Sequence, residues 1–197
     1  MTETLAEPIT DREALPVELV DAAGHAVGAC PVAQAHTAPG LLHRAFSVLL
    51  YDDAGRVLLQ QRAAVKTRFP LLWANSACGH PAPGEPVAVA AAVRLAEELG
   101  LATALTEVGI FQYHAEDSAT GRVEHEWDHV LIGRLDAEFL RTAAPRPDPA
   151  EVADYAWIQP EALRDAIADN PGNYTPWLLG VLDIAEEAVR VVRRSFR

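Results

Sequence analysis

Short apolar runs bounded by turn residues predict β-strands in the first part of the chain. These runs cover residues 17–20, 27–30, 45–51 and 56–62. Residues 86–99 differ, because Val89, Val93 and Leu99 belong to an apolar series with three- and four-residue spacing. That spacing gives one apolar helix face, and Gly100 supplies a stop, so the pattern predicts a helix over residues 86–99.

The rest of the chain continues with strands and ends in helices. Residues 107–116 and 122–135 read as two strands joined by a hairpin turn, whereas residues 31–42 read as a loop. The remaining expected elements are a strand over residues 152–158 and helices over residues 161–168 and 177–194. This order predicts a mixed α/β (α+β) fold in which a sheet lies between helices.

Length and charge bound the class of protein. The 197 residues, half of them apolar, suffice for one domain with a proper core. We expect residues 1–16, which are polar and acidic, to form a flexible N-terminal tail and residues 17–197 to form a single domain. The net charge of −12 argues against nucleic acid as the main partner, because phosphate backbones need a basic face. A small phosphorylated molecule, held by a few local Arg or Lys and a metal ion, stays compatible with this charge.

Two further features bear on where the chain works. No apolar stretch reaches the roughly 18 residues of a membrane span, and the beginning of the chain lacks the pattern of a signal peptide. Cys30 and Cys78 are two thiols in a chain of this size, which favours reduced cysteines over a disulfide. We therefore expect a cytoplasmic protein without membrane or nucleic-acid partners, as a monomer or weak dimer.

Glu124 and Glu126 are the first candidates for chemistry. They lie two residues apart on a predicted strand, so both side chains point to one face. A solvated face is the simpler interpretation, and a bound cation is the alternative. His36, His43 and His80 lie in or beside predicted loops and strand starts and could join them. Three imidazoles with two carboxylates suit Mn²⁺, Fe²⁺ or Zn²⁺, and they suit Mg²⁺ less well.

Cys78 is a further candidate. It lies in a predicted Asn-Ser-Ala-Cys-Gly-His loop, and thiols in loops can have a tuned pKa. A small buried apolar side chain is the alternative interpretation. The segment from Arg62 to Arg68, with Lys66 between them, is a local basic cluster in an acidic chain. It is read either as a solvated loop or as an anion site.

The region around the predicted helix resembles a Nudix box. Five residues fit the spacing of that motif: Gly79, Glu85, Glu97, Glu98 and Gly100. Val93-Arg94 stands where the hydrolases with this motif have Arg-Glu. The frame of the motif is thus present, but one carboxylate that matters to the hydrolases is absent.

Further motifs resemble the type I isopentenyl-diphosphate isomerases, a family with the Nudix fold. In chain order the matching pieces are Ala35-His36-Thr37-Ala38, Leu42-His43-Arg44-Ala45-Phe46-Ser47, Trp73-Ala74-Asn75-Ser76-Ala77-Cys78-Gly79-His80-Pro81, Gly84-Glu85, Glu97-Glu98-Leu99-Gly100, Tyr113, Glu124-His125-Glu126 and Thr175-Pro176-Trp177. The resemblance implies a single Nudix-type catalytic domain. It also implies isomerisation of isopentenyl diphosphate to dimethylallyl diphosphate, a step of isoprenoid biosynthesis.

The same resemblance implies the residues that bind metal and substrate. The divalent metal, Mn²⁺, Zn²⁺ or Mg²⁺, would be held by His36, His43, His80, Glu124 and Glu126. A Mg²⁺ that bridges to the diphosphate would be held with the help of Glu98. The diphosphate itself would be contacted by Arg62, Lys66 and Arg94.

The catalytic roles also follow from the resemblance. Cys78 and Glu126 would form the acid–base pair on opposite faces of the alkene. Tyr113 would assist proton delivery, and Trp177 would face the tertiary carbocation. General acid–base help of this kind is typically worth about 10²–10⁴-fold per group.

The chain departs from the family pattern at several positions. Val32 stands where the family usually has Lys, and Ala74 and Ala77 replace residues that are often Thr and Cys. An enzyme acting on another prenyl diphosphate, for example by protonation-initiated cyclisation, is therefore an alternative. A Nudix diphosphate hydrolase and a non-catalytic binding protein are further alternatives.

Overall fold

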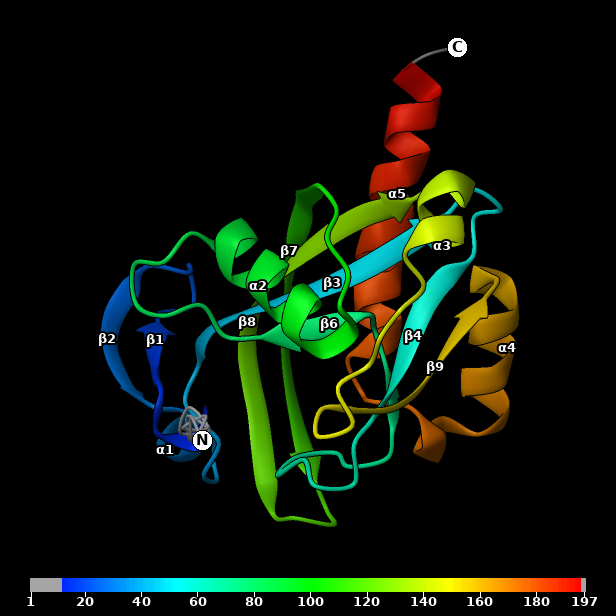
Figure 1. The fold of residues 1–197 in the computed structure, drawn as a ribbon. Helices are drawn as coiled ribbons and strands as arrows, with labels where there is room; N and C mark the ends of the chain where they lie inside the picture. The colour runs from blue at the N-terminus through cyan, green and yellow to red at the C-terminus, as the bar shows by residue number, and fades with distance from the viewer. Residues whose placement is uncertain (1–11, 196–197) are drawn as a thin grey trace, which may run out of the picture.

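The computed structural model describes residues 12–195, which form a mixed β-sheet flanked by helices (Figure 1). The strands are β1 (Pro16–Val20), β2 (Ala26–Pro31), β3 (His43–Asp52), β4 (Val57–Arg62), β5 (Trp73–Ala74), β6 (Ala77–Gly79), β7 (Leu105–Asp117), β8 (Arg122–Leu135) and β9 (Val152–Ile158). The helices are α1 (Val32–Ala35), α2 (Val87–Leu99), α3 (Ala137–Thr142), α4 (Pro160–Asp169) and α5 (Leu178–Ser195), with 3₁₀ turns η1 (Arg12–Ala14) and η2 (Pro171–Asn173). None of the described helices is both long and apolar enough to cross a membrane.

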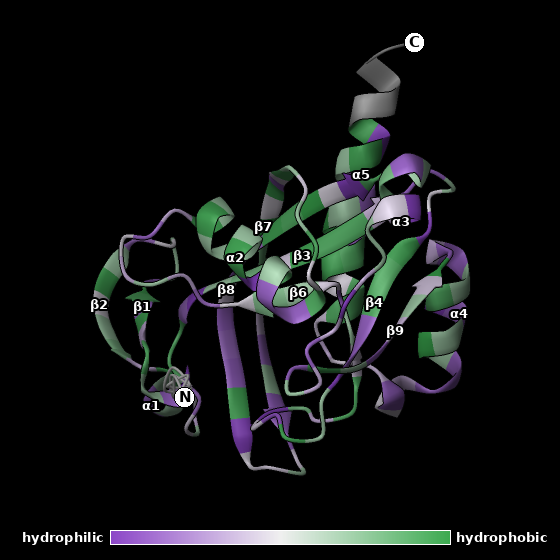
Figure 2. Cartoon of the chain, in the orientation of Figure 1, coloured by the Kyte–Doolittle hydropathy of each residue, from purple (hydrophilic) through white to green (hydrophobic). Residues whose placement is uncertain are grey.

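Strand β3 is the centre of the sheet. It runs parallel to β8 and antiparallel to β1, β4 and β6, and β7 pairs with the far side of β8. The β3–β8 pairing begins at His43 opposite Glu126, so residues 122–125 of β8 extend beyond β3. In Figure 2, strand β3 is mainly hydrophobic where it lies within the sheet, whereas the part of β8 that extends beyond β3 is largely hydrophilic.

The core lies on both faces of β3. Phe46, Val48 and Leu50 belong to the cluster that includes Leu95 of α2, and Leu49 belongs to the cluster packed on α5. Alternate residues of a strand point to opposite faces, so covering both faces explains why β3 reads as an almost continuous apolar run. The predicted sheet between helices is confirmed.

Helix α2 ends as predicted but buries a different face. Gly100 adopts φ 63°, and its amide donates to the Ala96 carbonyl, which is a left-handed helix cap. Val89 and Val93, however, are exposed, whereas Arg94 and Glu98 are buried on the side that faces the cavity described below. The helix therefore presents a charged pair inward, which apolar spacing alone does not predict.

Two local predictions were wrong. The loop expected over residues 31–42 contains α1, and Cys78 lies on β6 rather than in a loop. Both elements are too short for a recognisable apolar period, and β6 is formed by pairing with β3. Within the expected 1–16 tail, residues 12–14 form η1 and β1 begins at Pro16, while residues 1–11 lie outside the described residues.

Candidate active site

Three imidazoles and two carboxylates meet at one end of the β3–β8 pair. The group comprises His36, His43, His80, Glu124 and Glu126, and its five ligand atoms lie within 4.8 Å of one another. The three imidazole centroids are 4.6 to 5.0 Å apart. Placing these imidazoles and carboxylates so close together away from water is unfavourable unless a cation neutralises the carboxylates and accepts the imidazole lone pairs.

The sheet register brings this group together. His43 begins β3 directly opposite Glu126 of β8, and Glu124 lies two residues earlier on the same face of β8. His36 follows α1, and its carbonyl accepts from the Val123 amide, which ties this turn to β8. His80 comes directly after β6, which pairs with β3.

The imidazoles of His36 and His43 are oriented for metal binding. The Nδ1 atom of His36 lies 2.8 Å from the Val32 carbonyl oxygen, and that of His43 lies 2.7 Å from the Leu41 carbonyl oxygen. Nδ1–H donates in each case, so the lone pair is on Nε2 and faces the cluster. Within the described residues, both Nε2 atoms and the Glu124 Oε2 atom are buried without a hydrogen bond. These orphaned atoms fit a divalent metal ion.

Glu126 is shared between the cluster and Tyr113. Its Oε1 lies 3.0 Å from His80 Nε2, and its Oε2 accepts from the Tyr113 hydroxyl at 2.7 Å. Burial lowers the pKa of His80 to about 3, so the ring is neutral at pH 7, as a metal ligand must be.

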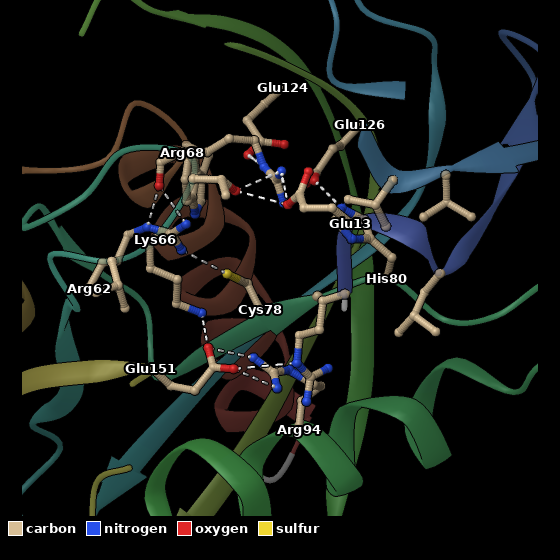
Figure 3. Close-up of a pocket in the computed structure, with 18 of the residues that line it drawn as sticks. Glu13, Arg62, Lys66, Arg68, Cys78, His80, Arg94, Glu124, Glu126 and Glu151 are labelled. Carbon is tan, nitrogen blue, oxygen red and sulfur yellow. Dashed lines mark hydrogen bonds and ion pairs between the residues drawn. The ribbon is translucent and has the colours of Figure 1, made fainter. Parts of the chain in front are cut away.

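The cluster opens into a cavity of about 390 Å³, large enough for a small ligand. In Figure 3, Glu124 and Glu126 lie at one end of this cavity, Arg94 and Glu151 lie at the other, and Cys78 lies between them. The cavity thus joins an imidazole–carboxylate end to a cationic end, with a thiol in between.

The Cys78 thiol is held in its protonated form. Burial raises its pKa to about 11, although the nearby Arg62 guanidinium opposes the shift. Arg62 Nη1 lies 3.6 Å from the sulfur, and the same guanidinium donates to the Arg68 and Phe69 carbonyls. A protonated thiol can act as an acid, and it becomes a base only when it has given up its proton.

The cationic end is built from residues whose charges are already paired. Lys66 and Arg94 both contact the Glu151 carboxylate, and Arg94 also pairs with Glu98. Burial would raise the pKa of Glu151, but Lys66 and Arg94 hold it at about 2. Glu98 is buried and also accepts from Gln60 at 2.8 Å. An arriving anion would compete with Glu151 for these two cations.

Trp177 forms an aromatic wall of the cavity. The ring is only 2% exposed, stacks on Tyr113 at 5.7 Å between centroids and lies edge-on to Phe69 at 5.2 Å. Its Nε1–H donates to Asn75 Oδ1 at 3.0 Å. The Arg62 guanidinium lies 5.7 Å from the ring centroid, so the face of this ring already accepts a positive charge.

Most of the residues singled out for the site line this cavity. His36, His43 and Glu98 do not line it, but each contacts a residue that does. The side chains of Arg68, Asn75, Asp128 and Glu151, which sequence reasoning did not assign, also belong to this region. Asp128 follows Glu126 at the next position on the same strand face, and burial raises its pKa well above its usual range. The period of the strand could have identified Asp128, and the motif that contains Cys78 also contains Asn75, whereas Glu151 carries no local signal.

This fold and site define a protein of the Nudix class. The sequence matches the NUDIX domain family over residues 41–178. The solved structure of DR0079 from Deinococcus radiodurans superposes with a TM-score of 0.66 at 21% identity, covering 85% of this chain and 97% of that one. A MutT protein from Methanosarcina mazei Go1 gives a TM-score of 0.57 at 15% identity, covering 74% and 94%. These two likenesses concern the fold alone.

Closer relatives define the family more narrowly. The isopentenyl-diphosphate Delta-isomerase of Nocardia farcinica (strain IFM 10152) is 69% identical over 176 residues, which cover 89% of this chain and 97% of the relative. That of Streptomyces griseus subsp. griseus is 45% identical over 179 residues, covering 90% and 87%. The chain therefore belongs to the isopentenyl-diphosphate Delta-isomerases of the NUDIX family, and the resemblance found in its motifs is confirmed.

Proposed function

We propose that this chain isomerises isopentenyl diphosphate to dimethylallyl diphosphate. The observation that carries the proposal is the placement of Cys78 and Glu126 on one cavity, between an aromatic wall and a cationic end. The reaction adds a proton at C4 of the substrate and removes one from C2. Moving a double bond in this way needs two groups that exchange protons, and the cavity offers a thiol and a carboxylate.

Cys78 and Glu126 are the acid–base pair in this proposal. One adds the proton at C4 and the other removes a proton from C2, and the roles exchange in the reverse direction. The tertiary cation at C3 between these steps is reactive toward water, so a dry cavity matters. Tyr113 assists because its hydroxyl donates to the Glu126 carboxylate, and Trp177 offers its ring face to the cation.

The five-residue cluster would hold one divalent metal, for which Mn²⁺, Zn²⁺ and Mg²⁺ are the candidates. Its ligands would be His36, His43, His80, Glu124 and Glu126. The mixed imidazole and carboxylate set favours Mn²⁺ or Zn²⁺ over Mg²⁺. When bound, this ion would stabilise negative charge on the Glu126 carboxylate and so tune its proton affinity.

The cationic end would bind the diphosphate. Lys66 and Arg94 would exchange their contacts with Glu151 for phosphate oxygens, and Arg62 would approach from the side of Cys78. Glu98 would help hold a Mg²⁺ that arrives with the diphosphate, as hard oxygen ligands suit that ion. Fixing the diphosphate places the alkene between Cys78 and Glu126 and uses remote binding energy for orientation.

The place of action follows from the same proposal. The two free cysteines, Cys30 and Cys78, are consistent with a reducing cytoplasm. The substrate is a small diphosphate, for which local cations suffice in an otherwise acidic chain.

The test is proton NMR of the purified protein with isopentenyl diphosphate, Mg²⁺ and Mn²⁺ in D₂O. We expect dimethylallyl diphosphate with deuterium in a methyl group. Glu126→Gln should abolish this product, whereas Glu107→Gln should not, since Glu107 pairs with His129 outside the cavity. An unchanged spectrum from folded, metal-loaded protein would refute the proposal and lead to a panel of other prenyl diphosphates.

A further inference from the structure

Arg68 is a largely buried charged side chain beside the five-residue His/Glu cluster. It is only 11% exposed, and its guanidinium lies between two carboxylates. Nε donates to Glu124 Oε1 at 3.1 Å, and Nη1 donates to Glu13 Oε1 at 2.7 Å. Figure 3 shows Arg68 beside Glu124, with Glu13 from the segment before β1 reaching toward the same end of the cavity.

The two oxygens of Glu124 have different surroundings. Oε2 lies 2.8 Å from His36 Nε2 and faces the imidazoles without a hydrogen bond from the described residues. Oε1 is held by Arg68. The carboxylate therefore presents one oxygen to the metal cluster and has the other fixed by a charged donor, which is the strong kind of hydrogen bond.

Glu126 has an equivalent arrangement with a different donor. Its Oε1 faces His80, and its Oε2 accepts from the Tyr113 hydroxyl. In each carboxylate of the cluster, one oxygen thus faces an imidazole, and the other accepts a hydrogen bond from a residue outside the cluster. Donors that hold the outer atoms of metal ligands fix their orientation, and losing one typically weakens metal binding by about 10–100-fold.

Charge alone would make Arg68 unfavourable for a metal site. A guanidinium next to a divalent cation repels it, so a site built for affinity should avoid one. Here the Glu13 carboxylate contacts the same guanidinium. The Arg68–Glu13 pair has no net formal charge, so Glu13 offsets the repulsion between Arg68 and a bound cation, while Arg68 keeps its contact with Glu124.

We propose that Arg68 is a positioning residue of the metal centre, which holds Glu124 with a single oxygen toward the bound ion and is itself balanced by Glu13. The proposal rests on the five-residue cluster binding a divalent metal. It adds a residue from the loop between β4 and β5 (residues 63–72), and one from the segment before β1, to the groups on which metal affinity depends. The metal centre is thereby linked to two segments that contribute no ligand to it.

The test is a calorimetric titration of metal-free protein with Mn²⁺. Arg68→Met should weaken Mn²⁺ binding by about 10–100-fold. The matched control is Arg164→Met, because Arg164 is likewise shared by two carboxylates, Asp183 and Glu186, and does not line the cavity. The control should bind Mn²⁺ within about twofold of the parent. The visible spectrum of the Co²⁺-loaded protein should change in Arg68→Met and stay constant in Arg164→Met, since only Arg68 contacts a ligand.

A second variant separates orientation from folding and charge. Arg68→Lys keeps the charge but lacks the planar fork, so it should also weaken Mn²⁺ binding and remains informative if Arg68→Met fails to fold. Unchanged or tighter Mn²⁺ binding by either folded variant overturns the positioning role. A parent protein that binds neither Mn²⁺ nor Co²⁺ overturns the metal centre itself, and the two failures are thus distinguishable.

Discussion

Substitution of Trp177 tests whether the cavity stabilises the proposed tertiary carbocation. The ring is packed between Phe69 and Tyr113, and its N–H is bonded to Asn75. Its face already accepts the Arg62 guanidinium at 5.7 Å. A cation formed next to this ring would gain about 0.5–2 kcal/mol from it. At about 1.36 kcal/mol per factor of ten, that energy corresponds to roughly 2- to 30-fold in rate.

Two substitutions at Trp177 distinguish the ring from its packing. Trp177→Leu removes the aromatic face, so kcat should fall by roughly 2- to 30-fold while KM changes little, because the substrate carries no cation before protonation. Trp177→Phe keeps a ring but leaves Asn75 Oδ1 without its donor. This variant should lose stability, by about 1–3 kcal/mol, and retain more of kcat than Trp177→Leu.

The assay is the deuterium-exchange NMR rate at several substrate concentrations, with thermal unfolding measured alongside. Both variants must be assayed below their own unfolding transitions, so that a loss of folded protein does not count as a loss of rate. A Trp177→Leu protein with kcat equal to that of Trp177→Phe would refute cation stabilisation by the ring. Equal proportional changes in kcat and KM would point instead to a packing effect on substrate position.

Three further predictions follow from the site and its supports. Removing the metal with a chelator should abolish turnover and lower Tm. Adding Mn²⁺ at about 100 times its Kd should then raise the free energy of unfolding by about 2.7 kcal/mol. Full activity after verified metal removal would contradict the metal centre. With a pKa of about 11, Cys78 is protonated at pH 8, so iodoacetamide should label it at least about tenfold more slowly than a free thiol with a pKa of about 8.5. The labelling rate should rise about tenfold per pH unit toward pH 11, and peptide mass spectrometry showing no such rise would refute the assignment. Gly180→Ala would place a Cβ 2.1 Å from the Phe111 ring, so the free energy of unfolding should fall by about 1–3 kcal/mol and Tm should fall with it. The control Gly172→Ala places its Cβ in open space and should leave Tm unchanged.

Much of the fold could be read from the sequence because it rests on local patterns. The β1–β2 and β7–β8 hairpins, β3, β4, β9 and helices α2, α4 and α5 lie close to the predicted ranges. Each of these elements is long enough to show a period or is closed by a turn residue such as Gly100. The short elements α1, α3, β5 and β6 have two to six residues and show no period, so only their packing partners define them.

The sequence by itself determined the kinds of chemical group and the family. The motif around Cys78, the Glu124–Glu126 pair and the Nudix frame identified thiol, carboxylate and imidazole candidates before any distance was known. Spacing also placed Glu124 and Glu126 on one face, because the two-residue period of a strand is fixed by backbone geometry.

Only the tertiary structure decided how these groups act on one another. The parallel register of β3 and β8 sets His43 opposite Glu126, although 83 positions separate them in the chain. Burial, which no local pattern reports, raises the pKa of Cys78 and lowers that of His80. Ion pairs between distant segments assign Glu151 to Lys66 and Arg94, and Arg68 to Glu124. Electrostatic energies depend on distance and solvent exposure rather than on sequence order, so these properties exist only once the chain is folded.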